Sequence, residues 1–161
     1  MAGVSISLTG ADLVTKGFDG LLARVGDMTP AWASVGGMLK TSVDRRFELG
    51  LDPDGNPWPP SVRALAEGHT LVERGHLRDS VTQEAQTDRV VQGSALVYAR
   101  IHQLGGTVLP KTGKRLRFRL GDAWVSPTSV TLPARPYLGA NAEDTAQAAE
   151  ILAEWVAEGW L

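Results

Sequence analysis

Residues 29–60 read TPAWASVGGMLKTSVDRRFELGLDPDGNPWPP, a helical pattern that runs directly into a proline-rich segment. Thr29 is suited to cap a helix, Pro30 fits the first helical position because its missing N–H is not needed there, and Gly50 is suited to end the helix. The apolar side chains between these ends recur at spacings of three and four: Trp32, Val35, Leu39, Val43 and Phe47. We therefore predict a long helix that packs this stripe in the core or against another helix. The pair Gly36-Gly37 inside it predicts a kink or a close backbone crossing.

The segment that follows, residues 51–60, contains four prolines and a glycine, which exclude both a helix and a central strand. We expect a rigid loop that Trp58 attaches to the core, because a stiff proline frame loses little entropy when it docks. Residues 52–56 resemble the start of a calcium-binding loop. That motif needs a further acid before the glycine and a glutamate six residues beyond it, where this chain has Ser61, so a turn is the favoured interpretation.

Two further helices are predicted, one on each side of this region. Residues 9–25 carry apolar side chains at helical spacing behind a suitable cap at Thr9, although Gly17 and Gly20 weaken the pattern. Asn141 is suited to cap a last helix whose first turn carries two favourable acids. We expect this last helix to bury four side chains: Ala148, Ile151, Leu152 and Trp155.

The strand signals come between residues 80 and 132. Residues 80–86 and 89–93 are rich in valine and threonine and predict a hairpin, and residues 98–104 predict one or two helical turns closed by Gly105-Gly106. Residues 115–120 alternate apolar side chains with arginines, which predicts a strand with one cationic face. Its expected partner is residues 123–132, across a Gly121-Asp122 turn.

These elements predict one α+β domain, in which helices flank a small, mainly antiparallel β-sheet. We expect the domain to span residues 1–161, with 1–50 helical and 76–140 carrying the sheet. The chain has 161 residues, enough to bury a core without disulfides, and its 43% hydrophobic content is typical of a globular protein. It contains no cysteine, which excludes disulfides, thiol catalysis and cysteine-based zinc sites. No signal peptide or membrane span is expected, so we interpret the chain as cytosolic.

Charge is unevenly distributed, although the net charge is only −2. A basic run without acids consists of Lys111, Lys114, Arg115, Arg117 and Arg119. The last helix carries no base, and three of its acids share one face at helical spacing: Glu150, Glu154 and Glu158. Solvation is the default interpretation of such an acidic face. The alternative is that it pairs with the arginine strand, either in the same chain or in a neighbouring copy, which would allow head-to-tail assembly.

No catalytic template is complete in this sequence. His69, His76 and His102 do not have the spacing of metal ligands, and no phosphate-binding glycine loop or nucleophile motif is present. A carboxylate pair for glycoside hydrolysis has no positive signal in its favour. We therefore expect no enzymatic activity, no metal and no cofactor.

Four segments, in order, resemble the phage virion morphogenesis (tail completion) family typified by phages Mu and P2: residues 52–58, 75–80, 98–106 and 132–139. The matched residues are expected to have structural roles: Asp54, Gly55, Trp58, Leu77, Ser80, Tyr98, His102, Gly105, Gly106, Pro133, Arg135 and Pro136. Arg135 is expected to clamp a carboxylate, within the fold or across an interface. Tyr98 and His102 lie one helical turn apart, and packing is favoured over an interface role.

This resemblance implies a non-enzymatic structural protein of a tailed phage or prophage that acts in tail completion and head–tail joining. It also implies an oligomeric ring around the DNA passage, located at the head–tail junction of the virion and assembled in the host cytoplasm. The expected partners are further copies of the chain and other neck, connector or tail proteins. The alternative is a DNA-binding accessory protein that uses the basic strand 114–119, since arginines two apart on a strand can follow phosphates without reading sequence.

Overall fold

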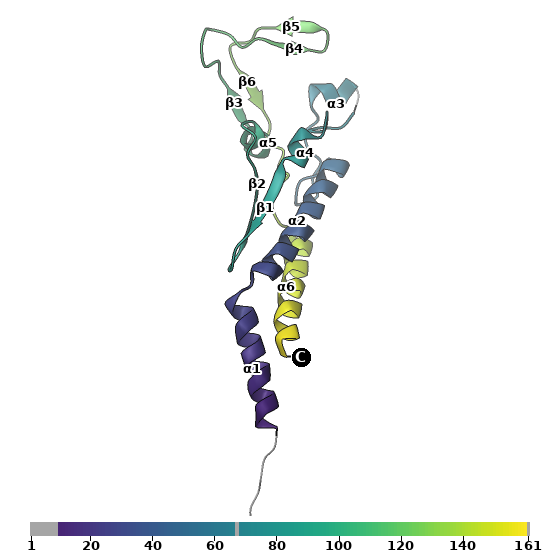
Figure 1. Cartoon of the computed structure of the whole chain (residues 1–161). Coiled ribbons are helices and arrows are strands. Elements are labelled where there is room, and N and C mark those ends of the chain that lie inside the picture. The colour runs from purple at the N-terminus through teal and green to yellow at the C-terminus, as the bar shows by residue number, and fades with distance from the viewer. Residues whose placement is uncertain (1–9, 67, 161) are drawn as a thin grey trace, which may run out of the picture.

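The computed structural model describes residues 10–66 and 68–160 of the chain. Its helices are α1 (Ala11–Gly26), α2 (Thr29–Leu49), α3 (Val62–Ala66), α4 (His76–Asp79), α5 (Ala99–Leu104) and α6 (Ala142–Ala157), followed by the 3-10 turn η1 (Glu158–Trp160). Its strands are β1 (Val81–Ala85), β2 (Val90–Ser94), β3 (Gly106–Val108), β4 (Phe118–Leu120), β5 (Ala123–Val125) and β6 (Val130–Leu132). Figure 1 shows an elongated α+β molecule in which α2 and α6 lie side by side, α1 extends from one end and the β4–β5 hairpin forms the other. The predicted fold class is confirmed.

Helix α2 begins and ends close to the predicted positions. Pro30 lies in its first turn, and Gly50 ends it with φ 70°, a conformation that glycine adopts without strain. The capping position is Met28, one residue earlier than predicted, and the carboxylate of Asp27 accepts a hydrogen bond from the N–H of Thr29. The prediction that Thr29 caps the helix was therefore wrong by one residue, because the nearby aspartate supplies the acceptor.

The core forms where the C-terminal half of α2 meets the β1–β2 hairpin, the α4 turn and the loops on either side. Its buried residues are Val43, Phe47, Trp58, Leu77, Val81, Ala99 and Tyr137. Phe47 lies at its centre, with ring centroids 5.5 Å from Trp58 and 5.2 Å from Tyr137. The stripe predicted on α2 is buried at Val35, Val43 and Phe47, as expected of core packing.

The strands form three separate antiparallel ribbons rather than one sheet. β1 pairs with β2, β3 with β6 and β4 with β5. The predicted hairpin of residues 80–93 is confirmed as β1–β2, with Val81 opposite Ser94 and Ala85 opposite Val90. The prediction that residues 123–132 form one partner strand was wrong. Pro127 interrupts that segment because it has no N–H to donate, so β5 pairs with β4 and β6 turns back to β3.

Gly36 marks a close crossing of α2 and the β1–β2 hairpin. A Cβ added at Gly36 would lie 2.8 Å from the side chain of Gln83 and 2.9 Å from that of Val90. The neighbouring Gly37 faces open space. The predicted close crossing is confirmed at the first glycine of the pair, and it sets how near the hairpin lies to the helix.

Helix α1 contacts the C-terminal turn through its two inner glycines. A Cβ at Gly20 would overlap the carbonyl oxygen of Gly159, and one at Gly17 would lie 2.9 Å from the ring of Trp160. Arg24 completes this contact by donating to the carbonyl of Trp155 at 3.0 Å. The glycines that weaken the helical pattern are therefore the residues that allow α1 to pack. The predicted cap, residue 9, lies outside the described residues.

Helix α6 has the predicted cap. The side chain of Asn141 accepts from the N–H of Asp144, whose carboxylate accepts from the N–H of Asn141, and this forms a complete capping box. The four side chains expected to be buried on α6 are half-buried: Ala148, Ile151, Leu152 and Trp155.

Candidate functional site

Trp58 joins the proline-rich loop to the core. Its side chain is buried, and its indole Nε1 donates to the carbonyl of Pro136 at 2.8 Å. The first turn of this loop is held by Asp52, whose carboxylate accepts from the main-chain N–H of Asn56 at 2.8 Å. This hydrogen bond is the main reason that the pKa of Asp52 is below its ordinary value. The loop therefore has the rigid form expected from its prolines, and it lies against residues 133–139.

Arg135 provides the second link between these two loops. Its guanidinium donates to the carbonyls of Pro59, at 2.6 Å, and Pro60, at 3.3 Å. Burial lowers the pKa of Arg135. Within the fold, the carboxylate expected opposite Arg135 was the wrong partner, because a guanidinium fork can instead satisfy two main-chain carbonyls of the facing proline-rich loop. A carboxylate across an interface stays a prediction. We name residues 51–60 and 133–139 together the loop cluster.

Gln103 of α5 holds the loop cluster from its other side. Its Oε1 accepts from the main-chain N–H groups of Tyr137, at 2.9 Å, and Leu138, at 3.0 Å, and its Nε2 donates to the carbonyl of Leu138. These bonds satisfy main-chain groups that a buried loop would otherwise leave unpaired. Gln103 was not predicted as a site residue, because a glutamine on a short helix carries no distinctive pattern.

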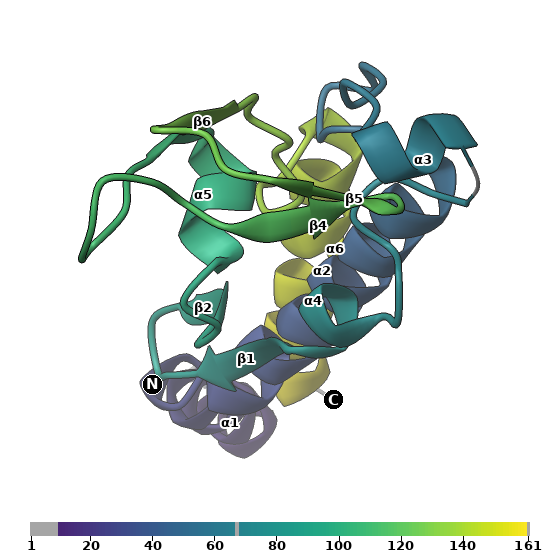
Figure 2. The same ribbon diagram turned by 90° about the horizontal axis from the view of Figure 1, so that it is seen from above.

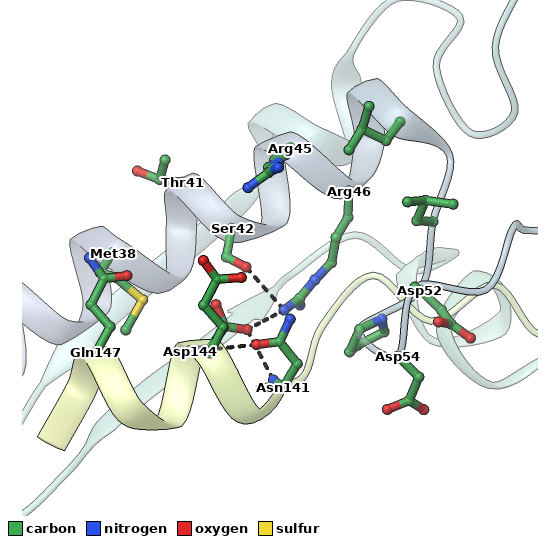
Figure 3. Close-up of a pocket in the computed structure, with 15 residues that line it drawn as sticks. Met38, Thr41, Ser42, Arg45, Arg46, Asp52, Asp54, Asn141, Asp144 and Gln147 are labelled. Atoms are coloured by element: carbon green, nitrogen blue, oxygen red, sulfur yellow. Dashed lines mark hydrogen bonds and ion pairs between the residues drawn. The ribbon is translucent and has the colours of Figure 1, made fainter.

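Arg46 and Asp144 form a buried ion pair that was also missed (Figure 3). Arg46 donates in addition to the carbonyls of Tyr137, at 3.1 Å, and Gly139, at 2.6 Å. The pair borders a polar cavity of about 450 Å³, which Asp52 and the exposed Asp54 also line. The capping box at Asn141 signals that Asp144 has a structural role, but nothing local points to Arg46.

The other matched residues lie around the loop cluster. Ser80 ends α4, donating to the carbonyl of Leu77 at 2.7 Å and meeting Ser94 Oγ at 2.7 Å. A Cβ at Gly105 would lie 2.6 Å from the main-chain nitrogen of Ala134, so α5 ends in direct contact with the cluster. Of the remaining residues, Gly55 lies in a turn, Gly106 begins β3 opposite Leu132, and Pro133 lines a groove. The matched segments thus build one internal frame.

Tyr98 and His102 pack edge to face, with ring centroids 5.9 Å apart, as the favoured interpretation predicted. Burial and, to a smaller extent, the charge of Arg135 lower the pKa of His102 below its ordinary value. Within the described residues, the buried Nδ1 of His102 has no hydrogen-bond partner. Both effects favour the neutral form of the imidazole.

We name residues 106–132, which carry β3 to β6, the arm. Its arginines are each engaged within the arm: Arg115 donates to the carbonyl of Ser126 at 2.9 Å, and Arg119 contacts Asp122 at 3.0 Å. Arg117 lies 5.0 Å above the ring of Trp124, which is 65% exposed. The face predicted to be wholly cationic therefore also presents an aromatic ring. Lys111 and Lys114 are exposed in the loop that precedes β4.

The acidic face of α6 lies far from the arm. Glu150 and Glu154 are exposed, and Glu158 pairs with Arg24 of α1 at 2.9 Å. Figure 1 places the C-terminal end of α6 and the β4–β5 hairpin at opposite ends of the molecule. Pairing of the arm with this acidic face inside one chain was therefore wrong as a prediction. The solvated face and pairing between copies stay as the two interpretations.

A large groove separates the arm from the body of the molecule. Its volume is about 1160 Å³, and its walls come from α3, α4 and α5 on one side and from β4, β5 and β6 on the other. Figure 2, seen from above, shows the β4–β5 hairpin passing over the body toward α3. Tyr98, His102 and Arg135 line the inner end of the groove. The matched segments therefore also form part of one wall of this groove.

Residues 10–66 and 68–160 contain no group of three or more His, Cys, Asp or Glu side chains placed to hold a metal ion. None of the helices in these ranges combines the length and the apolar character that a membrane-spanning segment requires.

The geometry is that of a braced frame with two projecting parts, the arm and α1. The model of the phage virion morphogenesis family matches residues 11–157, from the start of α1 to the end of α6. The chain belongs to the phage virion morphogenesis family. The resemblance drawn from the four sequence segments is thus confirmed.

Two curated relatives support membership of the phage virion morphogenesis family. The chain is 26% identical over 152 residues to "Mu-like prophage FluMu G protein 2" of Haemophilus influenzae, with 94% of this chain and 95% of the relative covered. It is 32% identical over 111 residues to "Putative capsid assembly protein G" of Escherichia phage Mu, with 63% of this chain and 62% of the relative covered. No solved structure matches the chain.

Proposed function

We propose that the chain acts in tail completion and head–tail joining of a tailed phage or prophage, as a non-enzymatic subunit of an oligomeric ring. The observation that carries this proposal is the family match over residues 11–157, which includes both projecting parts of the molecule as well as its frame. The relative from phage Mu is described as a putative capsid assembly protein, which agrees with a role in building the particle. The working partners are further copies of the chain and other neck, connector or tail proteins, at the head–tail junction of the virion.

The distribution of side chains supports an assembly role. The matched polar residues of the loop cluster satisfy one another's hydrogen bonds and so brace the fold, leaving the arm and α1 as the parts available for contacts. The arm carries Arg117 and Trp124 on one exposed face, and arginine and tryptophan are enriched where proteins bind one another.

A prophage in which this gene is deleted tests the proposal. After induction, electron microscopy should show filled heads and separate tails, and expression of the intact chain should restore joined particles. The same count of joined particles after deletion and in the unmodified prophage would contradict the role. A matched control is the deletion complemented with the Lys40→Met variant. The ion pair of Lys40 with Asp44 is about one-third exposed and lies outside both projecting parts. This variant should restore particles fully.

DNA contact by the arm is the second candidate function. The observation in its favour is the exposed pair Lys111 and Lys114, which continues the cationic run of the arm. Such a surface would bind duplex DNA through phosphates, so affinity should fall steeply with salt and be indifferent to sequence. The measurement is fluorescence anisotropy with a labelled duplex at several salt concentrations. No binding at low salt, or equal binding by the Lys111→Glu and Lys114→Glu double variant, would exclude this candidate.

A further inference from the structure

Helix α1 presents an apolar side that the described part of the chain leaves exposed. We name Val14, Phe18, Leu22 and Val25 the α1 stripe; these side chains are 49%, 55%, 70% and 57% exposed. They follow one another at spacings of four, four and three residues, so they lie along one side of the helix. Another side of α1 packs on η1 through its glycines. Phe18 lies at the border between the two sides, because its ring also meets that of Trp160 edge to face, with centroids 5.4 Å apart. The outer surface of the stripe is left exposed by the described part of the chain.

The groove beneath the arm is the second apolar surface. The side chains that line it include Val62, Leu71, Leu77, Phe118, Leu120 and Val130. Its volume of about 1160 Å³ exceeds the roughly 300–1,000 Å³ of a typical small-molecule pocket. An open apolar groove of this size is suited to the apolar side of a helix, which binds through residues at spacings of three and four.

The charges around the two surfaces are of opposite sign. Asp19 precedes Leu22 by one helical turn and so lies beside the α1 stripe, and Glu150 and Glu154 are exposed on the neighbouring α6. The groove is lined by Arg63 and Arg74, and at its inner end by the buried Arg135, against the single glutamate Glu73. Such complementarity speeds encounter and selects orientation. It favours an occupant that carries acids next to an apolar helix face.

We propose that the α1 stripe of one copy docks in the groove beneath the arm of a second copy. This deepens the proposed function and rests on it, because it names the surfaces through which copies of the chain would join. A chain cannot fill its own groove, since α1 and the arm lie at opposite ends of the molecule (Figure 1) and only Asp27 and Met28 separate α1 from α2. The contact is heterologous, so repetition closes into a ring when the rotation between copies permits.

Four variants of the full chain test this contact. Leu22→Glu places a charge in the α1 stripe, and Leu120→Glu places one in the groove, at positions 70% and 42% exposed, where the fold should tolerate it. Leu13→Glu is the matched control on α1, because Leu13 is 74% exposed but lies on the side of the helix that carries Gly17 and Gly20, outside the stripe. Leu109→Glu is the control on the arm, at a position 64% exposed and outside the groove lining.

Analytical ultracentrifugation should show that the unmodified chain and both controls assemble as concentration rises. Each stripe or groove variant should have a dissociation constant raised by at least about tenfold. An equimolar mixture of Leu22→Glu and Leu120→Glu should form a one-to-one complex that grows no further. In that complex, the intact α1 of the Leu120→Glu chain occupies the intact groove of the Leu22→Glu chain.

The contact would be overturned by an unmodified chain that stays monomeric at all concentrations. It would also be overturned by control variants that weaken assembly as much as the stripe and groove variants do, or by a mixture that forms no one-to-one complex. Circular dichroism melts of all four variants would identify any loss of assembly that is caused by misfolding. In that case Val25→Glu in the stripe and Val130→Glu in the groove provide a second pair of variants. Binding of the stripe to a different virion protein, with a monomeric chain, would also overturn it.

The prophage deletion separates this contact from the proposed function. If the mixture behaves as expected but the deletion still yields joined particles, the proposed function fails and the contact stands. If the deletion yields separate heads and tails while the purified chain stays monomeric, the contact fails and the function stands.

Discussion

Arg46 of α2 and Asp144 of α6 form an ion pair in which only 6% and 7% of the two side chains is exposed. The guanidinium also reaches Ser42 and the carbonyls of Tyr137 and Gly139, and the carboxylate closes the capping box of α6. Every charge in this arrangement has several partners, which is the condition under which a buried pair is tolerated. The pair holds the two long helices to the loop cluster at one point.

Replacing Arg46 with methionine should lower the free energy of unfolding by about 3–5 kcal/mol, because Asp144 would remain buried without a compensating charge. Denaturant unfolding followed by tryptophan fluorescence measures this loss. Lys40→Met is the matched control on the same helix, since the ion pair of Lys40 with Asp44 is about one-third exposed and should contribute about 1 kcal/mol or less. Equal losses in the two variants would contradict a central role for Arg46.

Trp58 should show two separable contributions. Trp58→Phe keeps a ring in the core but leaves the carbonyl of Pro136 without its donor, at an expected cost of about 1–3 kcal/mol. Trp58→Ala also empties the space beside Phe47 and should cost about 3–5 kcal/mol. Thermal unfolding by calorimetry would rank them. A phenylalanine variant as stable as the unmodified chain would show that the indole hydrogen bond adds nothing.

The two adjacent glycines of α2 should respond in opposite directions. Gly36→Ala forces a methyl group to within 3 Å of Gln83 and Val90 and should destabilise the chain. Gly37→Ala meets open space and should stabilise it by about 0.5–1 kcal/mol through helix propensity. Melting temperatures of the two variants provide the test. Stabilisation by both would mean that the hairpin does not approach the helix as closely as described.

Stability should fall in mild acid partly through His102. Burial lowers the pKa of this imidazole below 6.5, so the unfolded chain binds a proton at a pH where the folded chain does not. The free energy of unfolding therefore keeps this contribution above about pH 6.5 and loses it as the pH falls toward the lowered pKa. The His102→Gln variant should lose less stability than the unmodified chain between about pH 7.5 and 5.5. Identical pH profiles would contradict the assignment. His69 and His76 are present in both proteins, so their contributions to the pH dependence cancel in this comparison.

Local signals predicted the long helices and the first hairpin. Pro30, Gly50 and Asn141 act on backbone a few residues away, so their effect can be deduced without knowing the fold. The β1–β2 hairpin is equally local, because four residues separate its strands.

Contacts between distant segments could not be deduced in this way. Arg46 and Asp144 are 98 residues apart in sequence, and Arg135 lies 76 residues from the Pro59 carbonyl that it binds. The sequence offers many possible hydrogen-bond acceptors for each of these arginines. Only the folded backbone determines which of them lies within reach. The arm shows the same limit, since alternation predicted an arginine face but not that Trp124 from the next strand would share it.

The contact between α1 and η1 also sets an order of events during synthesis. Arg24 binds the carbonyl of Trp155, 131 residues later in the chain. Helix α1 therefore emerges from the ribosome long before the residues that position it have been translated. A nascent subunit cannot hold α1 in its final orientation until residues 155–160 have emerged, which delays any assembly that depends on this helix until those residues have been translated.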